Sequence, residues 1–329
     1  MKRIFLHIGQ PKTATTTIQN FLAINRHELI KNGWLYPNAG RQYDAHHLLG
    51  NFFRAEPLHW IGPADPQAVM AALLQEIDET GCDNIILSTE SLYFAEHPAQ
   101  FADYLQDFDV RVVVFLRRQD EWIESAYQDN LKNGETRLDP ERYLIAHDGS
   151  LDYAGRLDFW SSAFGKDKLL VRSFEHNAKR LPVERVFLDT LGAPFTPNLI
   201  SPPIKNERLN RDCTTFLTMF EAQPRVDMKH EVIKNFLIKY SLHHPDPAEM
   251  KHVFPPKRRR EIVEAHAEAN AHVAREYLGQ EDGRLFSNLL PTDADPWQPY
   301  PGLRTRTAVA IAEFLASEMY QRITPERAG

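Results

Sequence analysis

The stretch HIGQPKTATTTIQNFL, residues 7–22, places one lysine and four threonines between an apolar strand pattern and a helix pattern. Lys12 supplies a full positive charge, and the threonines supply hydroxyl donors. A helix that begins here also presents unpaired backbone N–H groups and the positive end of its dipole. This combination fits a tetrahedral oxyanion. The alternative is a threonine-rich N-cap beside a solvated lysine, because Ser and Thr are favoured at helix starts.

The stretch departs from the nucleotide-binding pattern GxxxxGK[ST], in which the lysine stands directly before a Ser or Thr that binds Mg²⁺. Here Lys12 comes early, and Ala14 stands where a second glycine would be expected. No apolar strand pattern ends in an evident Walker B aspartate. The pattern therefore predicts an anion held by lysine and hydroxyls, without an obvious metal.

A second candidate is VVVFLRRQDEWIESAY, residues 112–127. Arg117 follows a buried strand pattern, and Ser125 lies eight residues later in the next helix pattern. A guanidinium is a planar fork that suits phosphate, so the pair could converge on one phosphate group. The alternative is that Arg117 and Arg118 pair with the acidic residues Asp120 and Glu121.

The elements that must position these residues alternate along the chain. Continuous β-branched runs separated by amphipathic patterns favour a parallel sheet covered on both faces. Such sheets bind ligands at the carboxyl ends of their strands. The expected strands cover residues 3–8, 84–88, 110–116 and 168–174, and the expected helices 15–33, 66–81, 119–134 and 183–192.

After about residue 200 the strand signal fades, and residues 213–222 and 260–279 are expected to be helical. We therefore predict an α/β fold with a P-loop-like strand–loop–helix unit. It would form a single domain over residues 1–329, with a core at 1–200 and a mainly helical part at 201–329.

Composition narrows the class of protein. The 329 residues are 43% hydrophobic and carry a net charge of −7, which argues against a general nucleic-acid binder. Cys82 and Cys213 have no CxxC spacing, and reduced thiols fit a cytoplasmic protein. No apolar run approaches the length of a membrane span.

Taken together, the two polar stretches resemble sulfotransferases that use 3′-phosphoadenosine 5′-phosphosulfate (PAPS). PKTATTT resembles their 5′-phosphosulfate loop, usually PKxGTT, and RRQDEWIES resembles their 3′-phosphate motif. KLLVRSFEHNAKRLPVERVFLDTLG (168–192) is similar to the next element of the family. HVAREYLGQEDGRLF (272–286) resembles a tail of bacterial carbohydrate-type members.

This resemblance implies roles for individual residues. Arg117 and Ser125 would bind the 3′-phosphate of PAPS and of its product, 3′-phosphoadenosine 5′-phosphate (PAP). The residues implied to hold the 5′-phosphosulfate are Lys12, Thr13, Ala14, Thr15, Thr16 and Thr17.

Three positions depart from the family pattern. Ala14 occupies a glycine position and would cost about 1 kcal/mol if its φ is positive. Thr17 replaces the aromatic residue found in many cytosolic members, so adenine must stack elsewhere. KRRR at 257–260 is the candidate for their basic C-terminal loop, and we interpret it as a solvated helix start.

Sulfuryl transfer needs a base for the proton of the acceptor hydroxyl. Glu90 follows the buried strand at 84–88, and glycan and tyrosyl-protein members of the family use a glutamate. Glu90 is therefore the first candidate, and the alternative is that it caps a helix or pairs with a cation. His46 and His47 are second candidates, of which one at most would face a site if both lie on a helix.

The sequence thus predicts a PAPS-dependent sulfotransferase that needs no metal and acts on a hydroxyl. The family tail and Glu90 favour a carbohydrate or glycolipid acceptor. Two alternatives stay open at this point. One is a kinase with a degenerate P-loop, and the other is a non-catalytic anion- or nucleotide-binding module.

Overall fold

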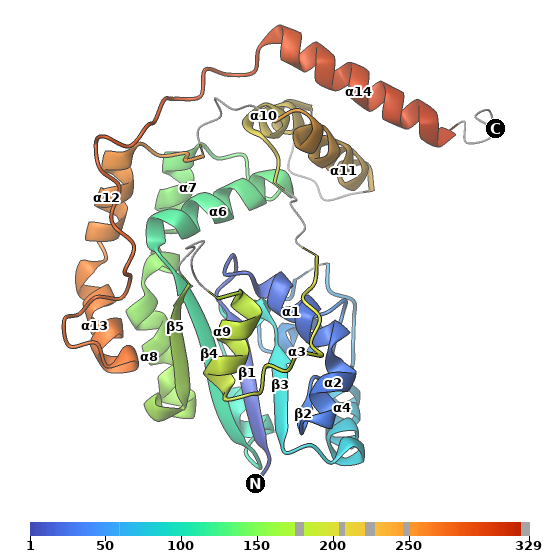
Figure 1. Ribbon diagram of the computed structural model, residues 1–329, viewed down its shortest axis with the longest axis vertical. Coiled ribbons are helices and arrows are strands. Elements are labelled where there is room, and N and C mark those ends of the chain that lie inside the picture. The colour runs from blue at the N-terminus through green and yellow to red at the C-terminus, as the bar shows by residue number, and fades with distance from the viewer. Residues whose placement is uncertain (59, 175–180, 204–207, 221–227, 246–250, 324–329) are drawn as a thin grey trace. The chain divides into compact units, whose positions relative to one another are not determined.

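A computed structural model describes residues 1–58, 60–174, 181–203, 208–220, 228–245 and 251–323. Its sheet has five parallel strands in the order β2-β3-β1-β4-β5. Figure 1 shows the strands side by side with helices around them. The strands are β1 (Arg3–Gly9), β2 (Trp34–Leu35), β3 (Asn84–Ser88), β4 (Asp109–Arg117) and β5 (Leu169–Phe174). The predicted α/β class is confirmed.

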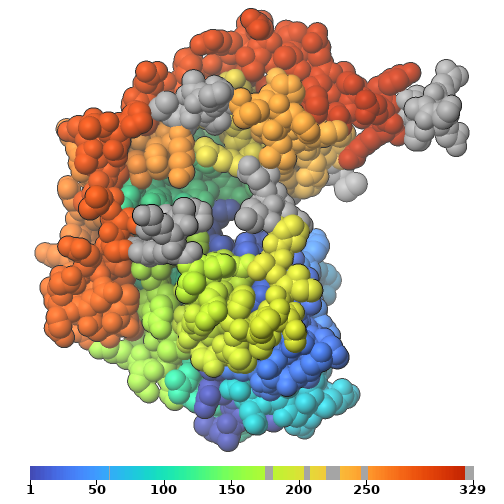
Figure 2. All heavy atoms as spheres, in the orientation of Figure 1, coloured from blue at the N-terminus to red at the C-terminus, as the bar shows by residue number. Residues whose placement is uncertain are grey.

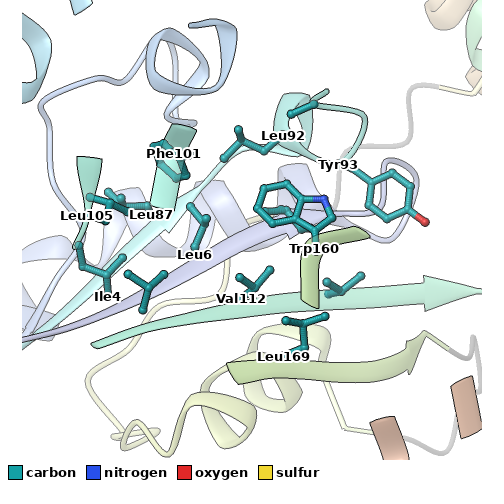
Figure 3. Close-up of a cluster of buried hydrophobic side chains, with 14 of the residues drawn as sticks. Ile4, Leu6, Leu87, Leu92, Tyr93, Phe101, Leu105, Val112, Trp160 and Leu169 are labelled. Atoms are coloured by element: carbon teal, nitrogen blue, oxygen red, sulfur yellow. The ribbon is translucent and has the colours of Figure 1, made fainter. Parts of the chain in front are cut away.

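Both faces of the sheet are buried, which explains its continuous apolar strands. Along β1, Ile4 and Leu6 face one side and Phe5 faces the other, since successive side chains alternate. Figure 3 shows the first side, where Leu6 and Val112 lie with Trp160. Trp160 is fully buried, so its replacement by alanine would cost about 3–5 kcal/mol.

Different helices cover the two faces. Figure 2 shows atoms of residues 181–203 against those of the first helices, consistent with the contacts of α9 with α1. Apolar side chains on the Leu6 side come from α4 (Pro66–Thr80), α5 (Pro98–Tyr104), α8 (Tyr153–Phe164) and α13 (Ala267–Leu278). Those on the Phe5 side come from α1 (Thr15–Ile24), α2 (Arg26–Lys31) and α9 (Val183–Leu191).

The end of β1 carries an extra residue. His7 pairs with Val113 of β4, but the next pair is Gly9 with Val114, so Ile8 has no partner of its own in that register. This local irregularity stands directly before the polar loop. A bulge of this kind bends a strand and redirects the chain that follows.

The helix expected at 15–33 is interrupted at Asn25. The Asn25 amide donates to the carbonyl oxygens of Phe21 and Ile200, and its Oδ1 accepts from the Ile200 N–H, all at 2.8 Å. Asparagine competes in this way with helical hydrogen bonds, so α1 ends and α2 begins anew. The bonds also attach α1 to the segment after α9.

The described chain divides into two compact units. Unit 1 contains the whole sheet and comprises residues 1–118, 152–204 and 266–288, and unit 2 comprises 119–151, 205–265 and 289–329. The helices of unit 2 are α6 (Gln119–Lys132), α7 (Pro140–Ala146), α10 (Arg211–Phe220), α11 (Met228–His243), α12 (Pro256–Glu264) and α14 (Thr305–Ile323). The single domain over 1–329 stays a prediction.

The KRRR segment begins a helix as expected, but it is not simply solvated. In α12, Arg259 is 5% exposed and pairs with the buried Asp120 at 2.7 Å. Arg258 pairs with Glu141, and Arg260 with Asp293. Because Arg259 and Asp120 are both buried, removing either one would leave an uncompensated buried charge, whereas the more exposed pairs of Arg258 and Arg260 contribute little.

The boundaries of the other predicted elements lie close to the observed ones, except that the helix expected at 260–279 falls into α12 and α13. The sequence did not single out β2, η1 (Glu90–Leu92) or the helices α3 (His47–Asn51), α5, α7, α8, α11 and α14. Residues 175–180 of the family-like segment and 221–222 of an expected helix lie outside the described residues. None of the helices within the described ranges is long and apolar enough to cross a bilayer.

Candidate active site

The loop from β1 to α1 turns through three left-handed residues. Gly9, Lys12 and Ala14 have φ angles of 80°, 67° and 61°. Lysine and alanine rarely adopt this conformation, because their Cβ atoms crowd the backbone. Left-handed residues in series turn backbone N–H groups toward one point and form anion-binding concavities.

The first turn of α1 has no side-chain cap. Its N-cap is Ala14, it has no acidic residue, and the backbone N–H groups of Thr15, Thr16 and Thr17 have no acceptor within the described chain. The threonine N-cap considered above is therefore not what the structure contains. These N–H groups carry the positive end of the helix dipole.

The threonines occupy different environments. Thr13 is fully buried, and its hydroxyl donates to the Gln10 carbonyl oxygen at 2.6 Å. Its single hydroxyl proton thus stabilises the loop. Thr15 is buried, Thr17 is half-buried and Thr16 is exposed, while Lys12 is half-buried.

The end of β4 is attached to this loop. The Arg117 N–H donates to Gln10 Oε1 at 3.0 Å, and Arg117 Nη1 donates to the Lys12 carbonyl oxygen at 3.3 Å. The Tyr153 hydroxyl donates to the Arg117 carbonyl oxygen at 2.7 Å. Two of the predicted site residues, Lys12 and Arg117, therefore lie together.

Ser125 lies half-buried on α6, in unit 2, whereas Arg117 belongs to unit 1. Beside Ser125, Glu124 accepts from His252 Nδ1 at 2.7 Å and from the Phe254 N–H at 2.8 Å. The convergence of Arg117 and Ser125 on one phosphate stays a prediction. The alternative pairing of Arg117 and Arg118 with Asp120 and Glu121 also stays a prediction; Asp120 does pair with Arg259.

Glu90 lies against the loop. A Cβ atom on Gly9 would be 3.0 Å from Glu90 Cβ and 3.2 Å from Thr15 Cγ2, so only glycine allows this approach. Glu90 is half-buried and opens η1. Gln19 Nε2 donates to its Oε2 at 2.7 Å, and its Oε1 has no hydrogen-bond partner among the described residues. The strand-end position predicted for Glu90 is the observed one.

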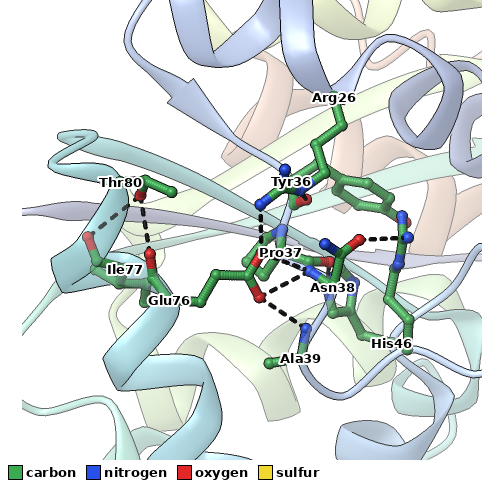
Figure 4. Close-up of polar contacts among 10 residues, drawn as sticks. Arg26, Tyr36, Pro37, Asn38, Ala39, His46, Glu76, Ile77 and Thr80 are labelled. Atoms are coloured by element: carbon green, nitrogen blue, oxygen red, sulfur yellow. Dashed lines mark hydrogen bonds and ion pairs between the residues drawn. The ribbon is translucent and has the colours of Figure 1, made fainter.

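His46 is engaged on both sides of its ring. The Ser88 N–H donates to Nδ1 at 3.1 Å, which makes Nε2 the protonated nitrogen, and Nε2 donates to the Pro37 carbonyl oxygen at 3.1 Å. Figure 4 shows the loop that contains Pro37. The backbone N–H groups of Asn38 and Ala39 in this loop donate to the carboxylate of Glu76. Burial lowers the pKa of His46 to about 3. No ring nitrogen is left for a substrate proton.

His47 opens α3, and its Nδ1 lies 3.0 Å from Thr89 Oγ1. Its ring packs edge-on against Trp60. Burial lowers the pKa of His47, and the negative charge of Glu90 opposes that effect. Gly50 lets α3 approach η1 closely, since a Cβ on Gly50 would be 2.1 Å from Ser91 Oγ. His47 is thus a neighbour of Glu90 held by tight packing.

Three polar residues around the loop escaped the sequence analysis: His7, Gln10 and Gln19. Gln19 is one helical turn beyond Thr15, so the i, i+4 spacing was the signal that could have found it. Gln10 and His7 are fully buried in a strand end and gave no periodic signal.

A pocket of about 580 Å³ lies at the carboxyl end of β5. Arg118 Nη1 donates to the Asn288 carbonyl oxygen at 3.3 Å, which attaches the adjoining segment to the end of β4. The pocket is lined by Ser173, Gln280, Glu281, Asp282, Arg284, Leu285 and Ser287. Neutral hydroxyl and amide groups thus alternate there with charges of both signs.

No protein-family model matches the chain. An uncharacterized protein of Archaeoglobus fulgidus is 25% identical over 195 residues, which are 57% of this chain and 51% of the relative. The chain thus spans about half the length of that relative. A sulfotransferase from Alicyclobacillus acidocaldarius is structurally similar over 62% of this chain and 86% of its own, with 18% identity and a TM-score of 0.42.

Proposed function

We propose that the protein is a sulfotransferase that moves the sulfuryl group of PAPS to a hydroxyl group of an acceptor. The observation that carries this proposal is the uncapped start of α1. Lys12, to whose carbonyl oxygen Arg117 donates, comes shortly before the free N–H groups of this helix start in the chain, and Thr15 and the half-buried Glu90 both lie against Gly9. An anion site next to a carboxylate suits a reaction that transfers an anionic group to a hydroxyl.

The residues of the loop would hold the 5′-phosphosulfate. The N–H groups of Thr15, Thr16 and Thr17 are fixed donors, and Lys12 adds a full charge. Fixed donors of this kind stabilise the negative charge that develops on a leaving group, because they need no reorganisation during the reaction. Arg117 would bind the 3′-phosphate from the end of β4, with Ser125 as its predicted partner.

Glu90 would serve as the general base. Its Oε1 would take the proton of the acceptor hydroxyl while the acceptor oxygen forms its bond to sulfur. The bond from sulfur to the 5′-phosphate oxygen breaks, and its electron pair leaves with PAP. A base must lie within about 3 Å of the proton that it removes. The acceptor therefore has to approach on the β1–β3 side of the loop.

The pocket at the end of β5 would take the nucleoside. Strands are about 4.8 Å apart, so β5 lies roughly 14 Å from β3, too far for an acceptor oxygen that must reach Glu90. The hydroxyl groups of Ser173 and Ser287 and the amide of Gln280 suit a ribose or an adenine edge. For the acceptor we propose a carbohydrate or glycolipid, on the family resemblance of residues 272–286.

Two measurements test the proposal. Calorimetry should show micromolar binding of PAP and much weaker binding of ATP, because only PAP carries a 3′-phosphate. Incubation with PAPS and a pool of hydroxylated acceptors should release PAP and add the mass of one sulfuryl group to an acceptor. Equal affinity for ATP would contradict the donor assignment.

Chelation separates this reaction from phosphoryl transfer. The transferred sulfuryl group carries less charge than a phosphoryl group, so lysine and backbone donors can suffice without Mg²⁺. Turnover should therefore persist in EDTA. Activity that disappears with EDTA and returns with Mg²⁺ would indicate a kinase, and PAP binding without turnover of any acceptor would indicate a binding module.

A further inference from the structure

Glu90 is held by a buried amide on the neighbouring helix. Gln19 of α1 is 4% exposed, and its Nε2 donates to Glu90 Oε2 at 2.7 Å. A carboxylate only accepts hydrogen bonds, so the atom that faces it must be the nitrogen of the amide. The orientation of the Gln19 amide is therefore fixed by Glu90 itself.

The same amide is held from behind. Its nitrogen lies 3.4 Å from Ser88 Oγ, and Ser88 Oγ lies 2.8 Å from Nδ1 of the fully buried His7. The His7 ring packs edge-on against Phe115 and Phe187. Burial keeps His7 neutral at ordinary pH, because it lowers the pKa of that ring to about 3. The neutral side chains of His7, Ser88 and Gln19 are thus connected in a row, and the Gln19 amide binds one oxygen of Glu90.

This support leaves the other oxygen, Oε1, for an incoming proton, and it adds no positive charge next to the base. A lysine or arginine in place of Gln19 would hold the carboxylate equally well but would reduce its basicity. Among the described residues, His47 of α3 and the Tyr36 hydroxyl after β2 are titratable groups that interact electrostatically with Glu90.

We propose that Gln19 is a positioning residue for Glu90, whose amide orients the carboxylate so that Oε1 receives the acceptor proton. This proposal rests on the proposed function, in which Glu90 is the base. Gln19 itself touches neither the donor nor the acceptor. Its effect should therefore appear in turnover and its pH dependence, and not in donor affinity.

The test compares Gln19→Met, which preserves length and shape, with Gln19→Glu and with a control on the same helix, Asn20→Leu. Gln19→Met removes a hydrogen bond to the charged form of Glu90, so the acidic limb of the kcat profile should move to higher pH by about half a unit or more. Turnover should fall roughly 10-fold to 100-fold, with PAP affinity within about 2-fold of the wild type.

Gln19→Glu places a second carboxylate against Glu90, so the acidic limb should move further in the same direction. Asn20→Leu should leave both the limb and kcat unchanged. An acidic limb that stays in place in Gln19→Met and Gln19→Glu would overturn the proposal, as would an equal loss in Asn20→Leu.

A second readout does not depend on turnover. In protein labelled with ¹³C at the glutamate carboxyl carbons, the Glu90 signal is identified by its loss in Glu90→Gln. Its titration midpoint should rise in Gln19→Met, and an unchanged midpoint would show that Gln19 does not act on Glu90. If no acceptor is ever sulfated, the proposed function fails, and this titration still decides whether the two residues are coupled.

Discussion

The guanidinium group of Arg117, at the end of β4, donates through Nη1 to the backbone carbonyl oxygen of Lys12, 3.3 Å away. This bond places the second cation of the site on the loop that carries the first. Arg117 therefore both shapes the loop and, in the proposed function, binds the 3′-phosphate. The two roles can be separated by the choice of ligand.

Arg117→Ala should lower the affinity for PAP by roughly 10-fold to 100-fold, since a charge-assisted contact contributes about 1.5–3 kcal/mol. Adenosine 5′-phosphosulfate lacks the 3′-phosphate, so its affinity should change much less. Calorimetry with both ligands measures the difference. Equal losses would mean that Arg117 serves the loop alone, and the assignment of the 3′-phosphate would be wrong.

Lys12→Ala should weaken PAPS and largely abolish transfer, because the variant loses the full charge beside the uncapped start of α1. A suitable control is Lys31→Ala, since Lys31 lies exposed on α2 and pairs with Glu28. Steady-state turnover of both variants shows whether Lys12 is needed for transfer, and thermal melts verify that both variants fold. Wild-type turnover in Lys12→Ala would exclude it from the site.

Ala14→Gly should stabilise the protein by about 0.5–1 kcal/mol. The left-handed conformation at φ 61° costs alanine roughly 1–2 kcal/mol, and the greater entropy of unfolded glycine offsets part of the gain. The matched control is Ala23→Gly inside α1, which should lose about 0.5–1 kcal/mol. Urea unfolding of the two variants should give changes of opposite sign, and a loss in both would contradict the prediction.

Glu90→Gln should lower turnover by roughly 10²-fold to 10⁴-fold and leave PAP affinity almost unchanged, because the amide keeps the shape but cannot accept the proton. His47→Ala provides the comparison, since its ring lies near Glu90 and was the second candidate for the base. If His47→Ala loses turnover while Glu90→Gln keeps most of it, the base is His47.

Stability should fall as the pH drops below about 6.5. His7 and His46 are neutral in the folded protein, with pKa values of about 3, whereas in the unfolded chain both titrate near 6.5. The unfolded state then binds more protons, so unfolding becomes easier by about 1.4 kcal/mol per pH unit for each histidine. Urea unfolding at pH 7 and pH 5.5 measures the change, and identical free energies at both values would contradict it.

Four of the five strands were predictable because each is a continuous apolar run that is buried on both faces, whereas the two-residue β2 was not predicted. The candidate site followed from the rule that parallel strands bring their carboxyl ends to one edge. Of the residues selected with this rule, Arg117 is bound to the Lys12 carbonyl oxygen and Glu90 lies against Gly9, while their roles stay predictions. For Ala14 the sequence left two possibilities, a strained positive φ or a reshaped loop, and the structure has the positive φ of 61°.

The remaining features depend on contacts between distant parts of the chain. At the break between α1 and α2, Asn25 binds the backbone of Ile200, which lies 175 residues further along the chain. The residues around Asn25 give no sign of this contact. Arg259 appeared solvated because its partner, Asp120, lies on another helix. His46 looked available because the Pro37 and Ser88 backbone groups that occupy its ring leave no trace in the residue pattern.

Because of the extra residue at the end of β1, the position of the loop depends on the number of residues in the strand as well as on their side chains. Because Ile8 is inserted between two paired residues, removing it would bring Gly9 into the regular register with β4 and turn the following loop toward the opposite face of the sheet. Lys12 and the start of α1 would then move away from Glu90 and Arg117. Over evolution, position 8 should therefore tolerate exchanges among apolar side chains, whereas residues 7–10 should accept neither insertions nor deletions.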